Sequence, residues 1–118
     1  MPRQATIYHN PACGTSRNVL AALRDAGIEP QVVEYLKTPP DRPTLERLLN
    51  SMGKPVRDIL RKRGTPYEEL GLDNPGLTDD RIFAAIAAHP ILIERPIVVV
   101  DGKAAVCRPS ETVQALLG

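Results

Sequence analysis

One of the two cysteines of this 118-residue sequence stands where a thiol can react. Cys13 lies between an expected strand and an expected helix, in the segment HNPACGTSR. The partial positive charge of a helix N-terminus favours the thiolate, which is the nucleophilic form of cysteine. Backbone N–H groups of Gly14, Thr15 and Ser16 would point out of this helix end, and Gly14 would let an oxyanion approach closely. The segment therefore predicts a nucleophile beside an anion-binding site.

The alternative for Cys13 is the role of most lone cysteines, a small buried hydrophobic residue. Packing alone gives no reason for the Gly-Thr-Ser run that follows, whereas an anion site gains hydrogen-bond donors from it. Thr15 and Ser16 can donate to an anion or cap the helix, and the two roles are compatible. The neighbouring residues thus favour a functional cysteine.

Three comparisons narrow the chemistry of this cysteine. Ser16 occupies the second position of a Cys-x-x-Cys motif, so no local disulfide can form and a second thiol must come from elsewhere. A cysteine phosphatase would need an arginine six residues after the cysteine, but Arg17 is only four residues after it. His9 and Cys13 are too few ligands for a zinc site. A Gly-rich nucleotide-binding motif is also absent from the sequence.

Periodicity predicts the elements around the cysteine. Residues Ala5 to His9 alternate β-forming side chains and end at Asn-Pro, which predicts a first strand. Apolar residues then recur at helical spacing from Thr15 or Ser16 to a stop at Gly27. Gln31 to Leu36 predicts a second strand. The chain thus begins with the order β-α-β.

The middle of the chain is predicted to be helical. Asp41 suits an N-cap and Gly53 a C-terminal stop, with one apolar stripe between them. Its members are Leu45, Leu48, Leu49 and Met52. Further helical stretches are predicted over Val56 to Arg63, near Tyr67 to Leu70, and from a Thr78 cap to about His89.

The C-terminal part predicts a hairpin and a helix. Strands over Ile97 to Val100 and Lys103 to Cys107 flank Asp101-Gly102, which suits a type I′ turn. A short helix follows over Pro109 to Leu117. This order is the plan of an α/β, thioredoxin-like domain: a mixed four-stranded sheet flanked by helices, with a helical insertion. By likeness to such folds, Pro96 is expected to follow a cis peptide bond.

Composition restricts the class of protein. Fifteen Lys and Arg against fourteen Asp and Glu leave a net charge of +1, which gives no sign of a nucleic-acid or membrane binder. No signal peptide or membrane-spanning run is evident, so we expect a cytoplasmic protein. With only two cysteines, a disulfide framework is not expected and both thiols should be reduced. The length predicts a single domain over residues 1–118.

Several segments in this order closely resemble the glutaredoxin-coupled bacterial arsenate reductases. They are YHNPACGTSRN (Tyr8 to Asn18), VRDILRK (Val56 to Lys62), PYE (Pro66 to Glu68), HPILIERPIV (His89 to Val98) and CRPSE (Cys107 to Glu111). The resemblance spans nearly the whole chain. We expect the chain to stop soon after its last helix, without the charged C-terminal tail of some members, and we do not expect this difference to disable the site.

The resemblance implies that Arg61, Arg95 and Arg108 converge on Cys13 and hold the oxyanion. A guanidinium is always charged, and its fork matches a tetrahedral anion better than an ammonium does. From the residues alone, Arg61 would belong to a solvated basic helical face, and the other two arginines would be exposed at the edge of the hairpin. The resemblance also implies that His9 tunes the thiolate or assists proton transfer, while the alternative is a surface histidine.

Two other residues are expected to be structural. His89 should end a helix before a proline. Cys107 should be a buried, inert thiol, while the alternative, from its closeness to Arg108, is a position near the site. By the resemblance, the reaction needs arsenate, glutathione as co-substrate and glutaredoxin as partner, without a bound cofactor or metal, and we expect a monomer. Two alternatives stay open: a glutathione-dependent thiol oxidoreductase of another substrate, and a redox-responsive regulator on the same fold. Such regulators usually carry Cys-x-x-Cys and lack the Cys-Arg-Pro-Ser segment.

Overall fold

A computed structural model describes residues 4–117 of the chain. These residues form two compact units. The sheet unit comprises the chain up to Thr38 together with the part from Arg95 onward, and the helical unit comprises Pro39–Glu94. The expected single domain over residues 1–118 stays a prediction, and each unit is described by itself.

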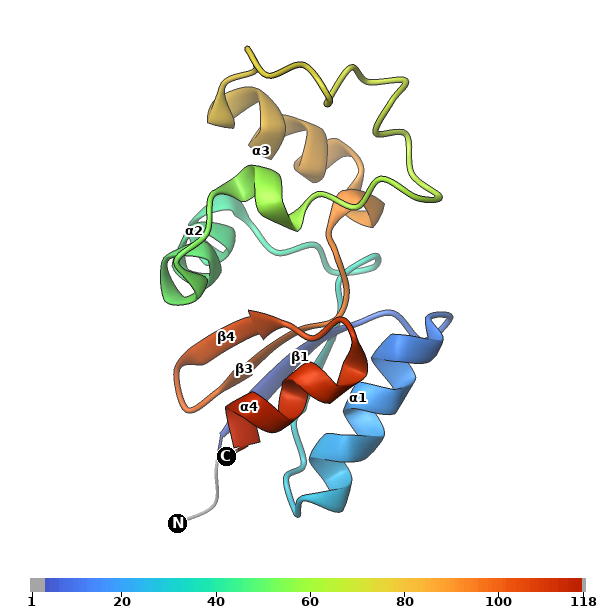
Figure 1. Cartoon of the computed structure of the whole chain (residues 1–118), viewed down its shortest axis with the longest axis vertical. Coiled ribbons are helices and arrows are strands. Elements are labelled where there is room, and N and C mark those ends of the chain that lie inside the picture. Colours follow the sequence, from blue (N-terminus) through green and yellow to red (C-terminus); the bar gives the residue numbers. More distant parts are fainter. Residues whose placement is uncertain (1–3, 118) are drawn as a thin grey trace. The chain divides into compact units, whose positions relative to one another are not determined.

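The sheet unit is built on one mixed sheet of four strands in the order β2-β1-β3-β4 (Figure 1). Strand β1 pairs in parallel with β2 and antiparallel with β3, and β3 pairs antiparallel with β4. The strands are β1 (Ala5–His9), β2 (Gln31–Glu34), β3 (Ile97–Val100) and β4 (Lys103–Val106). The predicted thioredoxin-like sheet is confirmed.

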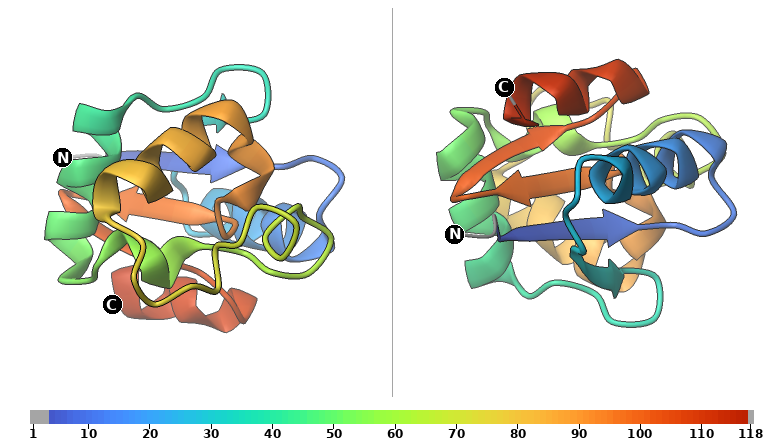
Figure 2. Two further views of the ribbon diagram at one scale, coloured as in Figure 1. Left: turned by 90° about the horizontal axis from the view of Figure 1, so that it is seen from above. Right: turned by 90° about the horizontal axis from the view of Figure 1, so that it is seen from below.

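One face of this sheet is covered by α1 (Gly14–Asp25) and α4 (Val113–Leu117), as Figure 2 shows from two further directions. A 3₁₀ turn, η3 (Ser110–Thr112), precedes α4, so only the second half of the predicted C-terminal helix is α-helical. Strand residues alternate between the two faces, and those that point toward the helices close the core of this unit. The buried members of this core are Ile7, Val19, Leu23, Ile28, Val98, Val100, Cys107 and Val113.

The turn between β3 and β4 has the backbone that its sequence predicts. Asp101 and Gly102 have φ angles of 51° and 84°, both in the left-handed region that a type I′ turn requires. The Asp101 carboxylate also accepts a hydrogen bond from the backbone N–H of Gln4 at 3.1 Å. The hairpin is therefore fixed by its own turn chemistry.

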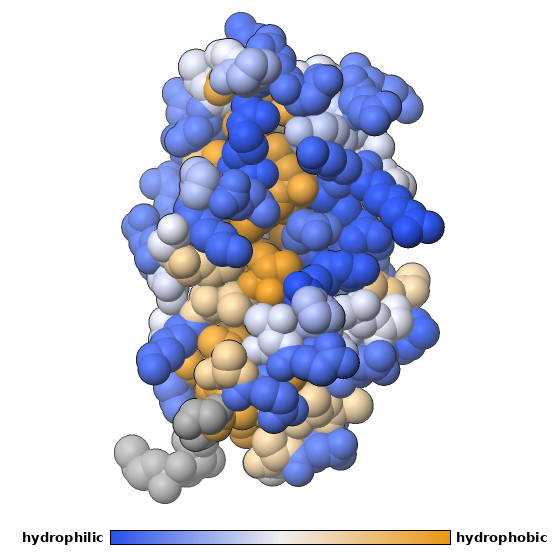
Figure 3. Space-filling model, in the orientation of Figure 1, coloured by the Kyte–Doolittle hydropathy of each residue, from blue (hydrophilic) through white to orange (hydrophobic). Residues whose placement is uncertain are grey.

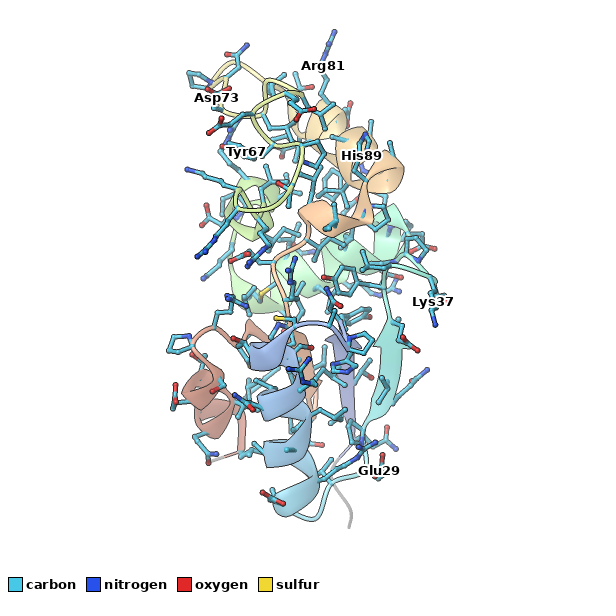
Figure 4. The ribbon with its side chains drawn as sticks, turned by 90° about the vertical axis from the view of Figure 1, so that its right-hand side faces the viewer. Glu29, Lys37, Tyr67, Asp73, Arg81 and His89 are labelled. Carbon is cyan, nitrogen blue, oxygen red and sulfur yellow. The ribbon has the colours of Figure 1, made fainter. Side chains whose placement is uncertain are left out.

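Strand β2 is shorter than the sequence predicts. It ends at Glu34, and not at Leu36. The backbone N–H groups of Lys37 and Thr38 both donate to the Glu34 carbonyl at 2.9 Å, which turns the chain out of the sheet. Figure 4 shows Lys37 on this turn. The turn leaves Tyr35 directly beyond the end of the strand.

The helical unit contains α2 (Arg42–Met52), η1 (Val56–Ile59), α3 (Asp79–Ala88) and η2 (Pro90–Leu92). The predicted caps are confirmed: Asp41 accepts from the backbone of Thr44, and Thr78 accepts from that of Arg81. Gly53 ends α2 in the left-handed conformation, with a φ angle of 68°. Both long helices therefore begin and end where the sequence predicts.

The predicted helix over Val56 to Arg63 is wrong beyond Ile59. Leu60 forms an isolated antiparallel bridge with Ile93, flanked by a hydrogen bond from Arg61 N–H to Leu92 O at 2.7 Å. This pairing takes the place of further helical bonds. Arg61 therefore lies on an extended segment, and not on a basic helical face.

Hydrophilic side chains cover most of the face drawn in Figure 3, with smaller apolar areas between them. Among residues 4–117, no helix has the length and apolar character needed to cross a bilayer.

Candidate active site

Cys13 is the N-cap residue of α1, as its position between a strand and a helix predicts. Asn10 shapes the loop that delivers it. Its carbonyl accepts from the Cys13 N–H at 3.0 Å, and its side-chain oxygen accepts from the Ala12 N–H, also at 3.0 Å. In the sequence, Asn10 and the following proline indicated only the stop of the first strand, and the part of Asn10 in shaping the Cys13 loop was not predicted. The tight turn fixes the sulfur at the helix N-terminus.

The strand register places several functional residues at one edge of the sheet. Tyr8 pairs with Ile97 and Ile97 pairs with Val106, so the residues beyond these pairs extend past the same edge. These residues include Arg95, which precedes β3, and Arg108, which follows β4. The guanidinium Nη1 of Arg108 donates to the Arg95 carbonyl at 3.1 Å. Antiparallel pairing within the hairpin thus brings together two arginines that lie 13 positions apart in the sequence.

The thiol of Cys13 is surrounded by positive charge within the sheet unit. Arg108 Nη1 lies 3.6 Å from the sulfur in hydrogen-bonding geometry. Burial by itself would raise the pKa of Cys13, but the backbone N–H of Ser16 and the side chains of Arg95 and Arg108 outweigh burial and lower the pKa to about 7. At neutral pH a large fraction of Cys13 is therefore thiolate.

Arg95 and Arg108 each precede a cis peptide bond, to Pro96 and Pro109 respectively. The cis bond expected before Pro96 is confirmed. From the residues alone, both arginines were expected to be exposed at the edge of the hairpin. In the structure both are only half-exposed. The Nε and Nη1 atoms of Arg95 are buried and have no hydrogen-bond acceptor among the described residues. Two guanidinium donors thus remain available beside the nucleophile.

His9 and Ser16 form a buried hydrogen-bonded pair beneath the Cys13 loop. The distance from His9 Nδ1 to Ser16 Oγ is 2.6 Å, and Ser16 Oγ also accepts from the Asn10 N–H at 3.1 Å. Burial lowers the pKa of His9, which keeps the imidazole neutral at pH 7. Which of the two groups donates in this pair depends on the tautomer of the imidazole. His9 is buried, and the alternative of a surface histidine is wrong.

The remaining residues of the predicted anion cradle lie in the first turn of α1. A Cβ atom on Gly14 would come no closer than 3.7 Å to the Arg17 guanidinium, an ordinary contact. The packing of the protein therefore does not itself require glycine at this position. Thr15 is half-buried beside it. That Gly14, Thr15 and the Ser16 backbone receive an oxyanion stays a prediction.

Arg61 belongs to the helical unit, where its guanidinium is firmly held. Nη1 lies 3.1 Å from a carboxylate oxygen of Glu94, and Nε donates to the Arg63 carbonyl at 3.1 Å. Only 15% of the Arg61 side chain is exposed. Arg61 is thus not a solvated surface residue, while its convergence on Cys13 stays a prediction.

Cys107 has the opposite environment from Cys13. It is fully buried, its backbone N–H donates to the Pro96 carbonyl at 2.9 Å, and burial raises the pKa of its thiol to about 12. The expected burial is confirmed. His89 is the C-cap residue of α3, where Figure 4 shows it, so its expected position at a helix end is confirmed.

Within residues 4–117, no group of three or more His, Cys, Asp or Glu side chains is arranged to hold a metal ion. The chemistry that the described site supports is that of a thiolate beside guanidinium and backbone N–H donors, which suits attack on a bound oxyanion.

A thiolate at the N-terminus of the first helix, on a mixed four-stranded sheet whose third strand follows a cis-proline, defines a thiol protein of the thioredoxin-like class. The model of the ArsC family matches residues 8–116. This chain belongs to the ArsC family.

Individual relatives agree with this assignment. The chain is 55% identical to an arsenate reductase of Rhizobium meliloti (strain 1021) over 95% of this chain and 80% of the relative. It is 54% identical to an arsenate reductase of Escherichia coli (strain K12) over 95% of this chain and 79% of the relative. The solved arsenate reductase from Vibrio cholerae superposes with a TM-score of 0.92 at 46% identity, and 98% of each chain is covered.

Proposed function

We propose that this chain is an arsenate reductase in which Cys13 is the nucleophile and glutathione supplies the second thiol. The observation that carries the proposal is the contact of Arg108 Nη1 with the Cys13 sulfur at 3.6 Å. It couples the nucleophile to a permanent positive charge that also attracts the anionic substrate. The relatives named above, which carry the name arsenate reductase, supply the identity of the substrate.

In the first step, arsenate binds to Arg95, Arg108 and the N–H groups at the start of α1. The Cys13 thiolate attacks arsenic and forms an S–As bond. One arsenic-bound oxygen takes up protons and leaves as water. Arsenic remains pentavalent in this adduct, and the donors around it offset the charge of its oxygens.

In the second step, the glutathione thiolate attacks the sulfur of Cys13. An S–S bond forms while the S–As bond breaks, and its electron pair stays on arsenic, which leaves as trivalent arsenite. Two thiols have thus supplied two electrons. Glutaredoxin then attacks the glutathione sulfur of the mixed disulfide and restores the Cys13 thiolate. Cys107 is fully buried with a pKa of about 12, which supports an external second thiol.

Arg61 is proposed as the third oxyanion ligand. Its partly buried ion pair with Glu94 holds the guanidinium in a defined orientation, which lowers the entropy lost when an anion binds. His9, as a neutral imidazole bonded to Ser16, is proposed to orient the first turn of α1 under the thiolate. Its part in catalysis is then indirect.

The same proposal covers partners and location. Glutathione and glutaredoxin are reductants of a reducing compartment, so we place the reaction in the cytoplasm. The reaction as written requires no bound cofactor. The monomeric state stays a prediction from the sequence.

The test is NADPH oxidation coupled through glutathione reductase, with glutathione and glutaredoxin, in the presence and absence of arsenate. We expect oxidation that depends on arsenate and stops when either glutathione or glutaredoxin is omitted. Arsenite should appear in a one-to-one ratio with the NADPH consumed. Oxidation without a need for arsenate would favour a thiol oxidoreductase of another substrate. No oxidation under any of these conditions would overturn the proposed function.

A further inference from the structure

Tyr35 is a fully buried residue whose hydroxyl has no hydrogen-bond partner among the described residues. A polar group buried without a partner costs about 1–3 kcal/mol, so such a group is rare and requires an explanation. A phenylalanine would fill the same volume without this cost. The hydroxyl therefore indicates a role outside packing.

The position of Tyr35 in the sheet unit points to that role. The last pair of the parallel ladder is His9 with Glu34, so Asn10 and Tyr35 are the first residues beyond β1 and β2. The carboxyl ends of parallel strands meet at one edge of a sheet. Tyr35 thus lies at the edge of the sheet where the Cys13 loop begins.

The ionisation of Tyr35 agrees with this placement. Burial raises the pKa of its hydroxyl, while Arg95 and the Asn10 side chain lower it and Cys13 raises it. These groups therefore lie near the hydroxyl, although none has the geometry of a hydrogen bond to it. With its pKa raised overall, Tyr35 keeps its proton and acts as a donor throughout the neutral range.

Three buried donor groups thus lack an acceptor near one nucleophile: the Tyr35 hydroxyl and the Nε and Nη1 atoms of Arg95. Arg95 is close enough to Cys13 to lower the pKa of its thiol. A tetrahedral oxyanion carries several acceptor oxygens and can satisfy all three groups at once. No described protein group does so.

We infer that Tyr35 is a further substrate-binding residue, whose hydroxyl donates a hydrogen bond to an oxygen of the arsenate held by Arg95 at Cys13. The inference rests on the proposed function. The cost of the unpaired hydroxyl in the free protein is recovered when arsenate binds, so stability is lower and substrate affinity higher than with phenylalanine at this position.

The experiment compares Tyr35→Phe with wild type and with Tyr67→Phe as a matched control. Tyr67 is also a buried tyrosine, but its hydroxyl is not among the buried unpartnered groups. Two quantities are measured on each protein: the melting temperature at increasing arsenate, and kcat and KM for arsenate in the coupled assay.

For Tyr35→Phe we expect an unchanged or higher melting temperature without arsenate, and a smaller rise in melting temperature when arsenate is added. The KM for arsenate should increase about tenfold or more, because one hydrogen bond to a charged group contributes about that much to affinity. Tyr67→Phe should keep the wild-type KM.

A lower melting temperature of Tyr35→Phe without arsenate, or a KM equal to that of wild type, would overturn the inference and leave the proposed function intact. Wild-type protein without arsenate-dependent turnover would instead overturn the proposed function.

Discussion

Arg108 Nη1 lies within hydrogen-bonding distance of the Cys13 sulfur, at 3.6 Å, although 95 positions separate the two residues in the chain. The same nitrogen donates to the Arg95 carbonyl at 3.1 Å. One guanidinium therefore connects the end of the hairpin to the thiol and to the segment that precedes β3. This relationship makes the reactivity of the thiol depend on the C-terminal part of the fold.

Removing the Arg108 guanidinium should raise the pKa of Cys13 above its value of about 7. In Arg108→Ala, the thiolate loses a hydrogen-bond donor and a nearby positive charge. The pH dependence of alkylation by iodoacetamide gives the apparent pKa. Arg17→Ala is the control, because Arg17 is exposed and its Nη1 is bonded to the Pro11 carbonyl. An equal change in both variants would contradict the specific role of Arg108.

The alkylation rate of the native protein should rise with pH through about 7, where Cys13 ionises. The folded-state pKa lies below the value of about 8.5 for an unperturbed thiol, so ionisation stabilises the folded chain. That contribution is fully present above about pH 8.5 and is lost as the pH falls through the folded-state pKa of about 7. Arsenate turnover should fall over the same acidic limb. An apparent pKa near that of free cysteine would contradict the activated site.

The two thiols should differ in accessibility as well as in acidity. Native protein at neutral pH should incorporate one alkyl group, on Cys13, because Cys107 is buried and has a pKa of about 12. Protein unfolded in urea should incorporate two. Peptide mass spectrometry identifies the labelled residue. Rapid labelling of Cys107 in the native chain would show that its site opens easily.

Cys13→Ala should abolish arsenate-dependent NADPH oxidation, whereas Cys107→Ala should retain most of it. Cys107 packs in the core, so its replacement by alanine should lower the free energy of unfolding by about 1 kcal/mol through the small cavity left behind. Coupled assays and urea unfolding separate the two effects. Comparable loss of activity in two well-folded variants would assign Cys107 a role in the chemistry.

Ser16→Ala should reduce stability, because Ser16 Oγ partners both the His9 ring and the buried Asn10 N–H. Leaving these groups unpaired should cost about 1–3 kcal/mol in the free energy of unfolding. Asn18→Ala, at an exposed position of the same helix, should change stability by less than about 0.5 kcal/mol. Equal urea midpoints for the two variants would argue against the buried pair as a support of the Cys13 loop.

The elements with strong local signals were predictable from the sequence. The Asp101-Gly102 turn, the caps at Asp41 and Thr78, and the position of Cys13 before α1 each depend on residues close in the chain. The errors arose where long-range pairing decides the structure. Leu60 leaves the predicted helix because Ile93 bridges it.

Part of the site could not be predicted from local patterns. The contact between Arg108 and Cys13 depends on the register of three strands, so only the resemblance to a family indicated it. Tyr35 was placed inside a strand as one more β-forming residue, and its unpartnered hydroxyl is visible only in the structure. Asn10 was recognised only as a strand stop, and its part in the Cys13 loop was missed because it shapes a turn and does not react.

The complete enclosure of Cys107 in the core has a consequence for how the protein behaves in isolation. Once Cys13 carries an arsenic adduct, the chain offers no second accessible thiol to release it, because Cys107 is buried. Purified protein given arsenate alone should therefore form at most one arsenic adduct per molecule. Turnover should resume only when a thiol such as glutathione is added.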